Sequence, residues 1–240
     1  MIDMFSTMGA IAFAAGFIGG VSGFGAGTVQ MIILPWFFPL NVAAGISGVI
    51  CLSLTITMLL RYRKHVKPRK LLLPIIYFLI GSYSAISFST YVDQVLMKKV
   101  MGIFLIFLSI YFLFVRKTKV EKVTELTAFI FSVISGVCDG LFGIGGPLMV
   151  ILFLARSDSK EEYLGNTQLH FTVTLILNCI IRACNGIITI GHSPYMLVGI
   201  VGIQLGFLLA NRVADRINGE QLKKIVYACV GLAGVVNLIG

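Results

Sequence analysis

Long apolar runs separated by short basic loops make up most of this chain. Six runs have the length that spans a bilayer as a helix, about 20 residues. They are 41–60, 71–91, 95–115, 163–182, 195–211 and 221–239. Residues 4–39 and 126–155 form two further runs, each too long for one ordinary span. None of the runs alternates apolar and polar residues as barrel strands do. The pattern therefore predicts an all-α polytopic membrane protein.

Each overlong run carries a glycine cluster, and the two clusters align without a gap at an offset of 120 residues. The aligned pairs are Gly16 with Gly136, Gly20 with Gly140, Gly23 with Gly143, and Gly25 with Gly145. Further along the chain the offset becomes 125, as for Gly81 and Gly206, which indicates a five-residue insertion within 183–193. The sequence therefore predicts two homologous halves, 1–120 and 121–240, that together form one membrane domain.

Glycine clusters at membrane depth either let helices pack closely or break the helix. If each overlong run crosses once, the cytoplasmic loops hold 11 Lys and Arg residues and the outer loops hold 8. If each run turns at its glycines and leaves on the side it entered, the numbers become 16 and 3. The positive-inside rule favours the second topology. Each half is then a glycine-broken, re-entrant helix pair plus three transmembrane helices, and the halves face opposite ways. A kinked, steeply tilted single crossing is the alternative.

A helix that begins at such a break is suited to bind an anion, because its first N–H groups are free and its N-terminus carries partial positive charge. We expect the second arms to begin near Thr28 and Pro147, and proline suits the first turn of a helix. Two such ends that meet near the midplane form one site. The predicted substrate-binding residues are Gly23, Gly25, Gly27, Thr28, Gln30, Ser47, Gly143, Gly145, Gly146, Asn166, Thr167 and Gln168.

Other polar side chains in the apolar runs have more than one interpretation. Each polar candidate in the predicted site can instead form a hydrogen bond between helices. Asp139 is a carboxylate inside an apolar run, and we predict that it carries a coupled proton. Capping of the second arm and pairing with a base are its alternatives. Arg182 stands near a helix end, where we expect it to extend to the interface, and His170 can lie there as well.

Composition and charge argue against several other classes of protein. The chain is 58% hydrophobic and 12% charged, whereas a soluble domain averages about 25% charged residues. The net charge of +9 comes from short loops without a pattern that binds nucleic acid. The five cysteines lack metal-ligand spacing, so we expect neither a metal nor a cofactor. No β-α-β unit surrounds the glycines, which argues against a dinucleotide site, and the N-terminus lacks the marks of a removable signal peptide.

The pattern G-x-x-x-G-x-x-G-x-G occurs twice, and each copy precedes a span that contains Gly45-Ile46-Ser47 or Gly165-Asn166-Thr167. This arrangement resembles the sulfite exporter TauE/SafE family over nearly the whole chain. The resemblance implies transport of small sulfur-containing anions, such as sulfite and sulfonates, across the bacterial inner membrane. Pro147 replaces a frequent third glycine of that family and Asp139 replaces a small residue, so the exact substrate stays open.

These observations predict a multi-pass transporter that exports sulfite or a related small sulfonate or organic anion by alternating access. A passive anion channel is an alternative that the same glycines would serve. A membrane-embedded enzyme is a weaker alternative, because the spans hold neither a nucleophile–base pair nor a metal-binding motif. The expected partners are the anionic substrate and the lipid bilayer, with a homo-oligomer left open.

Overall fold

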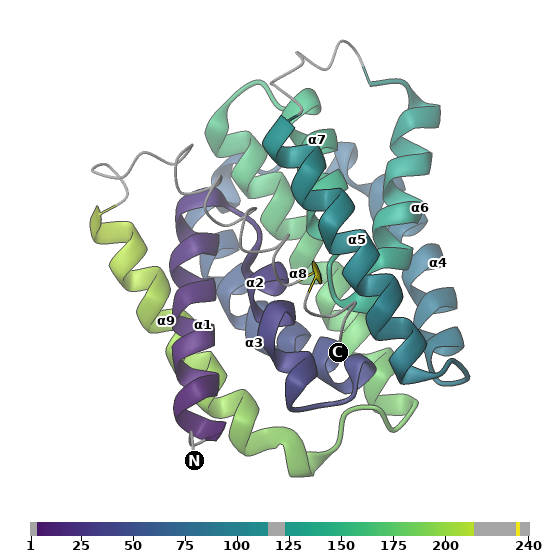
Figure 1. Cartoon of the computed structure of the whole chain (residues 1–240). Helices are drawn as coiled ribbons and strands as arrows, with labels where there is room; N and C mark the ends of the chain where they lie inside the picture. Colours follow the sequence, from purple (N-terminus) through teal and green to yellow (C-terminus); the bar gives the residue numbers. More distant parts are fainter. Residues whose placement is uncertain (1–3, 115–122, 214–233, 236–240) are drawn as a thin grey trace.

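The described part of the chain is helical, as the hydropathy pattern predicts. The computed structural model describes residues 4–114, 123–213 and 234–235. Its α-helices are α1 (Met4–Ser22), α2 (Ala26–Ile33), α3 (Leu40–Tyr62), α4 (Leu72–Ser89), α5 (Gln94–Phe114), α6 (Glu125–Phe142), α7 (Gly146–Arg156), α8 (Lys160–Cys184) and α9 (Ser193–Val213) (Figure 1). Within these residues, six helices are long and apolar enough to cross a membrane. The span expected at 221–239 lies almost entirely outside the described residues.

Both overlong runs are broken at their glycines. The first is divided between α1 and α2, and the second between α6 and α7. Gly23 has a φ of 80° and its counterpart Gly143 has a φ of 67°, a left-handed backbone that glycine adopts without steric cost. The N–H of Gly143 donates to the carbonyl oxygen of Asp139 at 2.8 Å and so closes the end of α6. The second arms begin at Ala26 and Gly146, close to the predicted positions.

The earlier glycines of each cluster serve close helix packing instead. A Cβ on Gly16 would clash with the carbonyl oxygen of Ile203 in α9, and one on Gly136 with the carbonyl oxygen of Phe78 in α4. Small residues of this kind let two helix backbones approach in a membrane. Packing and breaking are therefore not alternatives here, because each cluster begins as a packing surface and ends as a turn.

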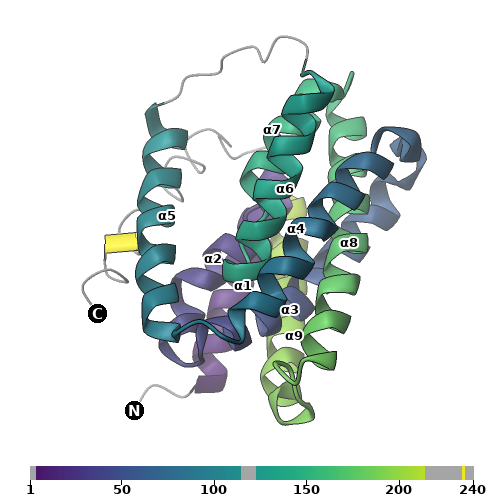
Figure 2. The same cartoon turned by 90° about the vertical axis from the view of Figure 1, so that its right-hand side faces the viewer.

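Each broken helix packs along a helix from the other half of the chain. Helix α1 lies beside α9, and α6 lies beside α4 (Figures 1 and 2). Facing positions are Gly9 and Val198, Gly20 and Ala210, Phe129 and Tyr77, and Gly140 and Ala85. In each pair of helices the residue numbers of the facing positions increase in the same direction, so the two helices run parallel. We call α1–α2 the first hairpin and α6–α7 the second hairpin.

Helices α3 and α8 cross the centre of the molecule in opposite directions. Gly165, near the start of α8, faces the carbonyl oxygen of Tyr62 at the end of α3. Helix α9 runs parallel to α3, since Gly199 faces Ile50 early in α9 and Asn211 binds Arg61 near its end. Because α1 is parallel to α9, the first hairpin begins and ends at the end of the molecule where α3 starts (Figure 1).

The second hairpin begins and ends at the opposite end of the molecule, where α8 starts. Ser82 of α4 binds Asn178 of α8, and Lys70, just before α4, binds Glu162 near the start of α8. Helices α4 and α8 are therefore parallel, and α6 is parallel to α4, so α6 begins where α8 begins. These directions fix the two hairpins within the protein, while the opposed orientation of the two halves in a bilayer stays a prediction.

The outer faces of the helices are apolar. Large exposed side chains include Leu72 and Ile80 of α4, Ile103 of α5, Leu126 of α6 and Val201 of α9. Soluble proteins rarely expose apolar surface on this scale. Contact with lipid accounts for it, in agreement with the predicted membrane protein.

Candidate functional site

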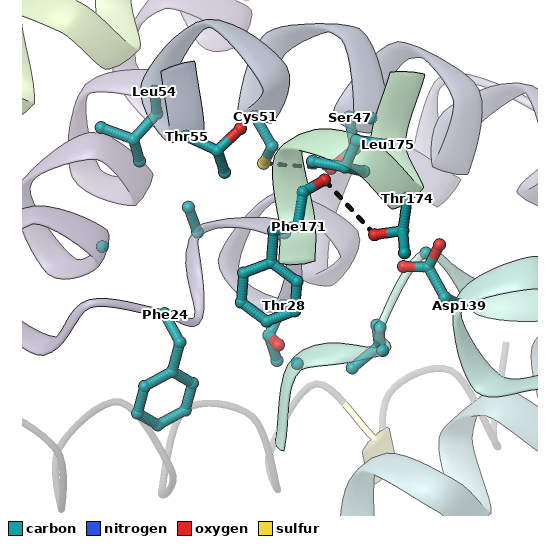
Figure 3. A pocket seen from close by; sticks show the side chains of 18 of the residues that line it. Phe24, Thr28, Ser47, Cys51, Leu54, Thr55, Asp139, Phe171, Thr174 and Leu175 are labelled. Carbon is teal, nitrogen blue, oxygen red and sulfur yellow. Dashed lines mark hydrogen bonds between the residues drawn. The ribbon is translucent and has the colours of Figure 1, made fainter. Parts of the chain in front are cut away.

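A cavity lies where the tips of the two hairpins meet between α3 and α8. We call residues 23–25 the first tip and residues 143–145 the second tip. The second tip contacts the start of α2, because a Cβ on Gly27 would lie 3.1 Å from the carbonyl oxygen of Gly143. The cavity has a volume of about 80 Å³, which at roughly 15 Å³ per molecule holds about five waters or one small hydrated ion. Figure 3 shows side chains of α2, α3 and α8 that line this cavity.

Most of the residues predicted for the site line this cavity. They are Gly23, Gly25, Gly27, Thr28, Ser47, Asp139, Gly143, Gly145, Gly146 and Gln168. Three predicted residues do not line it. Asn166 accepts a hydrogen bond from the backbone N–H of Lys67 at 2.8 Å, and Gln30 donates to the thiol of Cys51 at 3.3 Å. Thr167 is buried, and its hydroxyl has no partner among the described residues.

Two helix N-termini open onto the cavity. The backbone of α2 begins at Ala26, and the first of its amides to bond back into the helix is that of Val29, at 3.0 Å from the carbonyl oxygen of Gly25. The amides before it have no partner inside the helix. Helix α7 begins at Gly146, followed by Pro147, which has no N–H. Neither helix has a side chain that caps its first amides. The Asp139 carboxylate accepts a hydrogen bond from the backbone of Gly145, just before α7.

The tips are held by hydrogen bonds to their carbonyl oxygens. Gln168 of α8 donates to the carbonyl oxygen of Gly23 at 2.8 Å, and Ser135 of α6 donates to that of Gly145 at 2.6 Å. Both side chains are buried, where such bonds are costly to lose. These bonds fix the carbonyl oxygens of the two tips to side chains of α8 and α6.

The charged groups of the cavity, among its described lining residues, are Asp139 and Arg182. The Asp139 carboxylate accepts a hydrogen bond from the amide of Asn178 at 2.7 Å, and the Asn178 oxygen accepts one from Ser82 at 2.9 Å. Asp139 therefore does not stand alone in the apolar run, and it faces a polar side chain of α8. This contact leaves its proposed proton role untested.

Arg182 is 2% exposed, so the expectation that it extends to the interface is wrong. Its guanidinium donates to the carbonyl oxygens of Asp139 at 3.1 Å, Gly140 at 2.7 Å and Asn41 at 3.1 Å. The first two belong to the last turn of α6, and the Asp139 oxygen also accepts the N–H of Gly143. Arg182 therefore caps the second hairpin and brings a positive charge beside the cavity.

The sequence analysis missed several lining residues that share one face of α8. They are Phe171, Thr174, Leu175, Asn178, Cys179 and Arg182. These positions recur every three or four residues from Gln168, as one side of an α-helix does. Asn166 and Thr167 are two positions and one position before Gln168, so they point elsewhere. The helical period through Gln168 is the signal that would have identified this face.

His170 is fully buried, not interfacial. Its ring lies 5.0 Å from that of Phe78, 5.2 Å from Phe153 and 5.6 Å from Phe171, between ring centroids. Neither ring nitrogen has a partner among the described residues. Phe78 and Phe171 also line the cavity, so they separate the histidine from it.

Comparison with known proteins identifies the family. The sequence model of the sulfite exporter TauE/SafE family matches residues 8–237. This chain belongs to the TauE/SafE family. A relative from Methanocaldococcus jannaschii, named a probable membrane transporter protein, is 23% identical over 255 residues, which cover 95% of this chain and 93% of the relative. No solved structure matches the chain. The protein is thus a multi-pass membrane transporter with a small-molecule substrate, rather than an enzyme.

Proposed function

We propose that this TauE/SafE protein exports sulfite, or a related small sulfonate or organic anion, across a bacterial inner membrane by alternating access. One observation carries the proposal: two uncapped helix N-termini and a buried arginine surround a single cavity. Helix N-termini bind oxyanions through free amides and partial positive charge. The cavity volume of about 80 Å³ suits a small hydrated oxyanion.

In this proposal the anion oxygens accept hydrogen bonds from the first amides of α2 and α7. The hydroxyls of Thr28 and Ser47, which also line the cavity, supply further neutral donors. Neutral donors suit a site that must release its ligand, because binding has to be favourable enough for entry and weak enough for exit. Arg182 supplies the positive charge, and its three hydrogen bonds to carbonyl oxygens keep it in place.

Asp139 couples the anion to a proton in this proposal. An ionised Asp139 balances the charge of Arg182 and repels an arriving anion. A protonated Asp139 leaves the arginine charge for the substrate. Binding of the proton and the anion therefore favour one another, so both cross in the same direction. The membrane potential, negative inside, then drives a doubly charged anion outward together with one proton.

Alternating access follows from two inverted halves that rock about the shared site. The exchanged packing supports this, because the first hairpin packs on α9 and the second hairpin on α4. Contacts at matching positions of the two copies have matching geometry: Gly16 meets the backbone of Ile203, and Gly136 meets that of Phe78. Gly136 is 120 residues after Gly16, and Ile203 is 125 residues after Phe78, so the two repeat offsets relate these two contacts.

Flux measurements in proteoliposomes test the proposal. We expect sulfite to accumulate against its gradient when a proton gradient or a membrane potential is imposed. Downhill flux alone, at channel rates, would favour a passive anion channel. Turnover of sulfite without flux would favour an enzyme, and either result would refute the transporter mechanism.

Substitution of the tips tests the site itself. Gly25→Val forces a branched side chain onto a backbone with a φ of 90°. Gly145→Val places its Cβ within 2.7 Å of Asp139 and 2.9 Å of Phe78. We expect both variants to insert and to lose transport. Gly186→Val is the control, because Gly186 has a φ of 69° and open space around its Cβ, away from the cavity. Normal flux in both tip variants would remove the tips from the site.

A further inference from the structure

A cluster of ion pairs joins the two halves at one end of the α3–α8 pair. Lys67 and Lys70, between α3 and α4, lie 2.9 Å and 2.7 Å from the carboxylate of Glu162 in α8. Asp158 lies 3.7 Å and 3.6 Å from the same two lysines. We call these four residues the ionic closure. The hydrogen bond to Glu162 raises the pKa of Lys67 above its ordinary value, as expected for a direct pair.

A cluster of rings joins the two halves at the other end. Phe38, in the loop between α2 and α3, packs edge-on against Tyr195 of α9 at 5.4 Å and against His192 at 6.1 Å, between ring centroids. His192 and Tyr195 follow α8, so the contact again links one half to the other. We call these three residues the aromatic closure.

The two closures occupy equivalent positions of the repeat. Asp158 is 120 residues after Phe38, which is the offset of the glycine clusters. His192 is 125 residues after Lys67, and Tyr195 is 125 residues after Lys70, which is the offset of the later segments. The offsets come from glycines elsewhere in the chain. Equivalent segments of the two halves therefore form both contacts, which are an ion-pair cluster at one end and a ring cluster at the other.

We propose that the ionic closure and the aromatic closure are the two gates of the transport cycle, one at each end of the cavity. Rocking of the halves must separate one closure while the other holds, since each closure connects both halves. The proposal rests on alternating access and not on the identity of the anion. The two gates respond to different conditions, because salt screens ion pairs and leaves aromatic contacts in place.

The composition of the ionic closure suits a contact that opens and closes. The Glu162 side chain is 5% exposed, whereas those of Lys67 and Asp158 are 53% and 82% exposed. Exposed pairs are weak, because water and salt replace them readily. Glu162 is thus the buried anchor, and its loss leaves two lysines without their close partner.

Cys51 reports on both gates, because it lines the cavity between them. We would replace the other four cysteines with alanine and apply a membrane-impermeant thiol reagent to one side of oriented vesicles at a time. Labelling needs no substrate, so its result is independent of which anion is carried. A failure of the gates and a failure of the sulfite assignment are therefore distinguishable.

Glu162→Gln should raise the labelling rate of Cys51 several-fold from the side that holds the ionic closure, and not from the other side. Phe38→Ala should do the reverse. Glu125→Gln is the control for Glu162→Gln. It removes the 2.7 Å ion pair between Glu125 and Arg156, which lies outside the ionic closure, and should change neither labelling rate. Phe37→Ala removes the exposed neighbouring ring and is the control for Phe38→Ala.

High salt tests the same idea without any gate substitution. In the protein that retains Cys51 and both gates, raised ionic strength should increase labelling from the ionic side alone. The charge-reversed double variant Lys70→Glu, Glu162→Lys should return labelling toward that of the intact closure. Equal increases on both sides, or no change with salt and with Glu162→Gln, would overturn the proposal.

Discussion

The first and second hairpins share a backbone and differ in chemistry. Both break at aligned glycines and pack on a helix of the other half. The first tip is held from outside by Gln168, whereas the second tip is held by Ser135 of its own hairpin. The second hairpin carries Asp139 where the first has Gly19, 120 residues earlier. The two hairpins thus have a similar backbone, while a cavity-lining carboxylate is present in the second hairpin only.

The two long helices beside the tips differ in the same way. Four cavity-lining residues of α8 are amide, hydroxyl or charged side chains where α3 has other residues, whereas Phe171 and Leu175 stand where α3 has Cys51 and Thr55. The pairs, at an offset of 120, are Gln168 and Gly48, Thr174 and Leu54, Asn178 and Met58, and Arg182 and Tyr62. Of these two helices, α8 therefore supplies the amide and guanidinium groups of the cavity, whereas α3 supplies the hydroxyls of Ser47 and Thr55.

The largest expected effect comes from the shared packing surface. Gly16→Ala and Gly136→Ala each drive a Cβ into a carbonyl oxygen of the neighbouring helix, and overpacking of this kind costs about 1–3 kcal/mol or more. We expect both variants to lower the midpoint of thermal unfolding in detergent to a similar extent. Gly9→Ala should leave it unchanged, because its Cβ would make an ordinary 3.5 Å contact with Val198. Unequal losses would show that the scaffold is not shared equally.

The next effect distinguishes the two hairpins by charge. Asp139→Asn removes the ionisable group of the second hairpin while keeping a polar partner for Asn178. We expect sulfite flux to lose its dependence on an imposed pH gradient in proteoliposomes. Asp93→Asn, in the loop before α5 where Asp93 caps backbone amides, is the control. An unchanged pH dependence in Asp139→Asn would exclude the proton role.

A smaller effect is expected from the bond that holds the first tip. Gln168→Met keeps the length of the side chain but removes the donor to Gly23, leaving a buried carbonyl oxygen unpaired. This costs about 1–3 kcal/mol. We expect a several-fold drop in flux at similar expression, measured with equal amounts of reconstituted protein. A flux equal to that of the unaltered protein would mean that the first tip needs no support from α8.

The smallest effect is expected from Ser135→Ala. Its hydroxyl holds Gly145 within the second hairpin, but Arg182 also fixes the end of α6 there through Gly140. Loss of one neutral bond of this kind costs about 1 kcal/mol. Flux should therefore fall less than in Gln168→Met. The reverse order would show that the second tip depends more on its own side chains than on α8.

The helix breaks could be predicted from the sequence because their signal is local. Gly23 and Gly143 stand inside apolar runs too long for one span, and glycine adopts a left-handed backbone without cost. The start of α7 at Gly146 could also be predicted locally, because Pro147 suits the first turn of a helix. The choice between packing and breaking could not be settled locally, since the packing role of Gly16 depends on α9, far along the chain.

The role of Arg182 could not be predicted because it depends on a remote partner. Arg182 is close to the end of α8, which suggested an interfacial residue. The last turn of α6 lies beside it, and carbonyl oxygens of that turn accept hydrogen bonds from the Arg182 guanidinium. Gln30 illustrates the opposite error. It is two positions beyond the cavity-lining Thr28, which in a helix turns its side chain to a different face. It donates to the lining residue Cys51 without lining the cavity itself.

The exchange of hairpins between halves has a consequence for how the protein is made. Helix α1 ends at Ser22, whereas α9, on which it packs, begins at Ser193. At about 5–20 residues per second, a ribosome needs on the order of 10–30 s to cover that interval. During this time the first hairpin is in the membrane without its partner, and its packing glycines face lipid or the insertion machinery. The first half is therefore not expected to mature before most of the second half has been synthesised, because α9 completes the packing of the first hairpin.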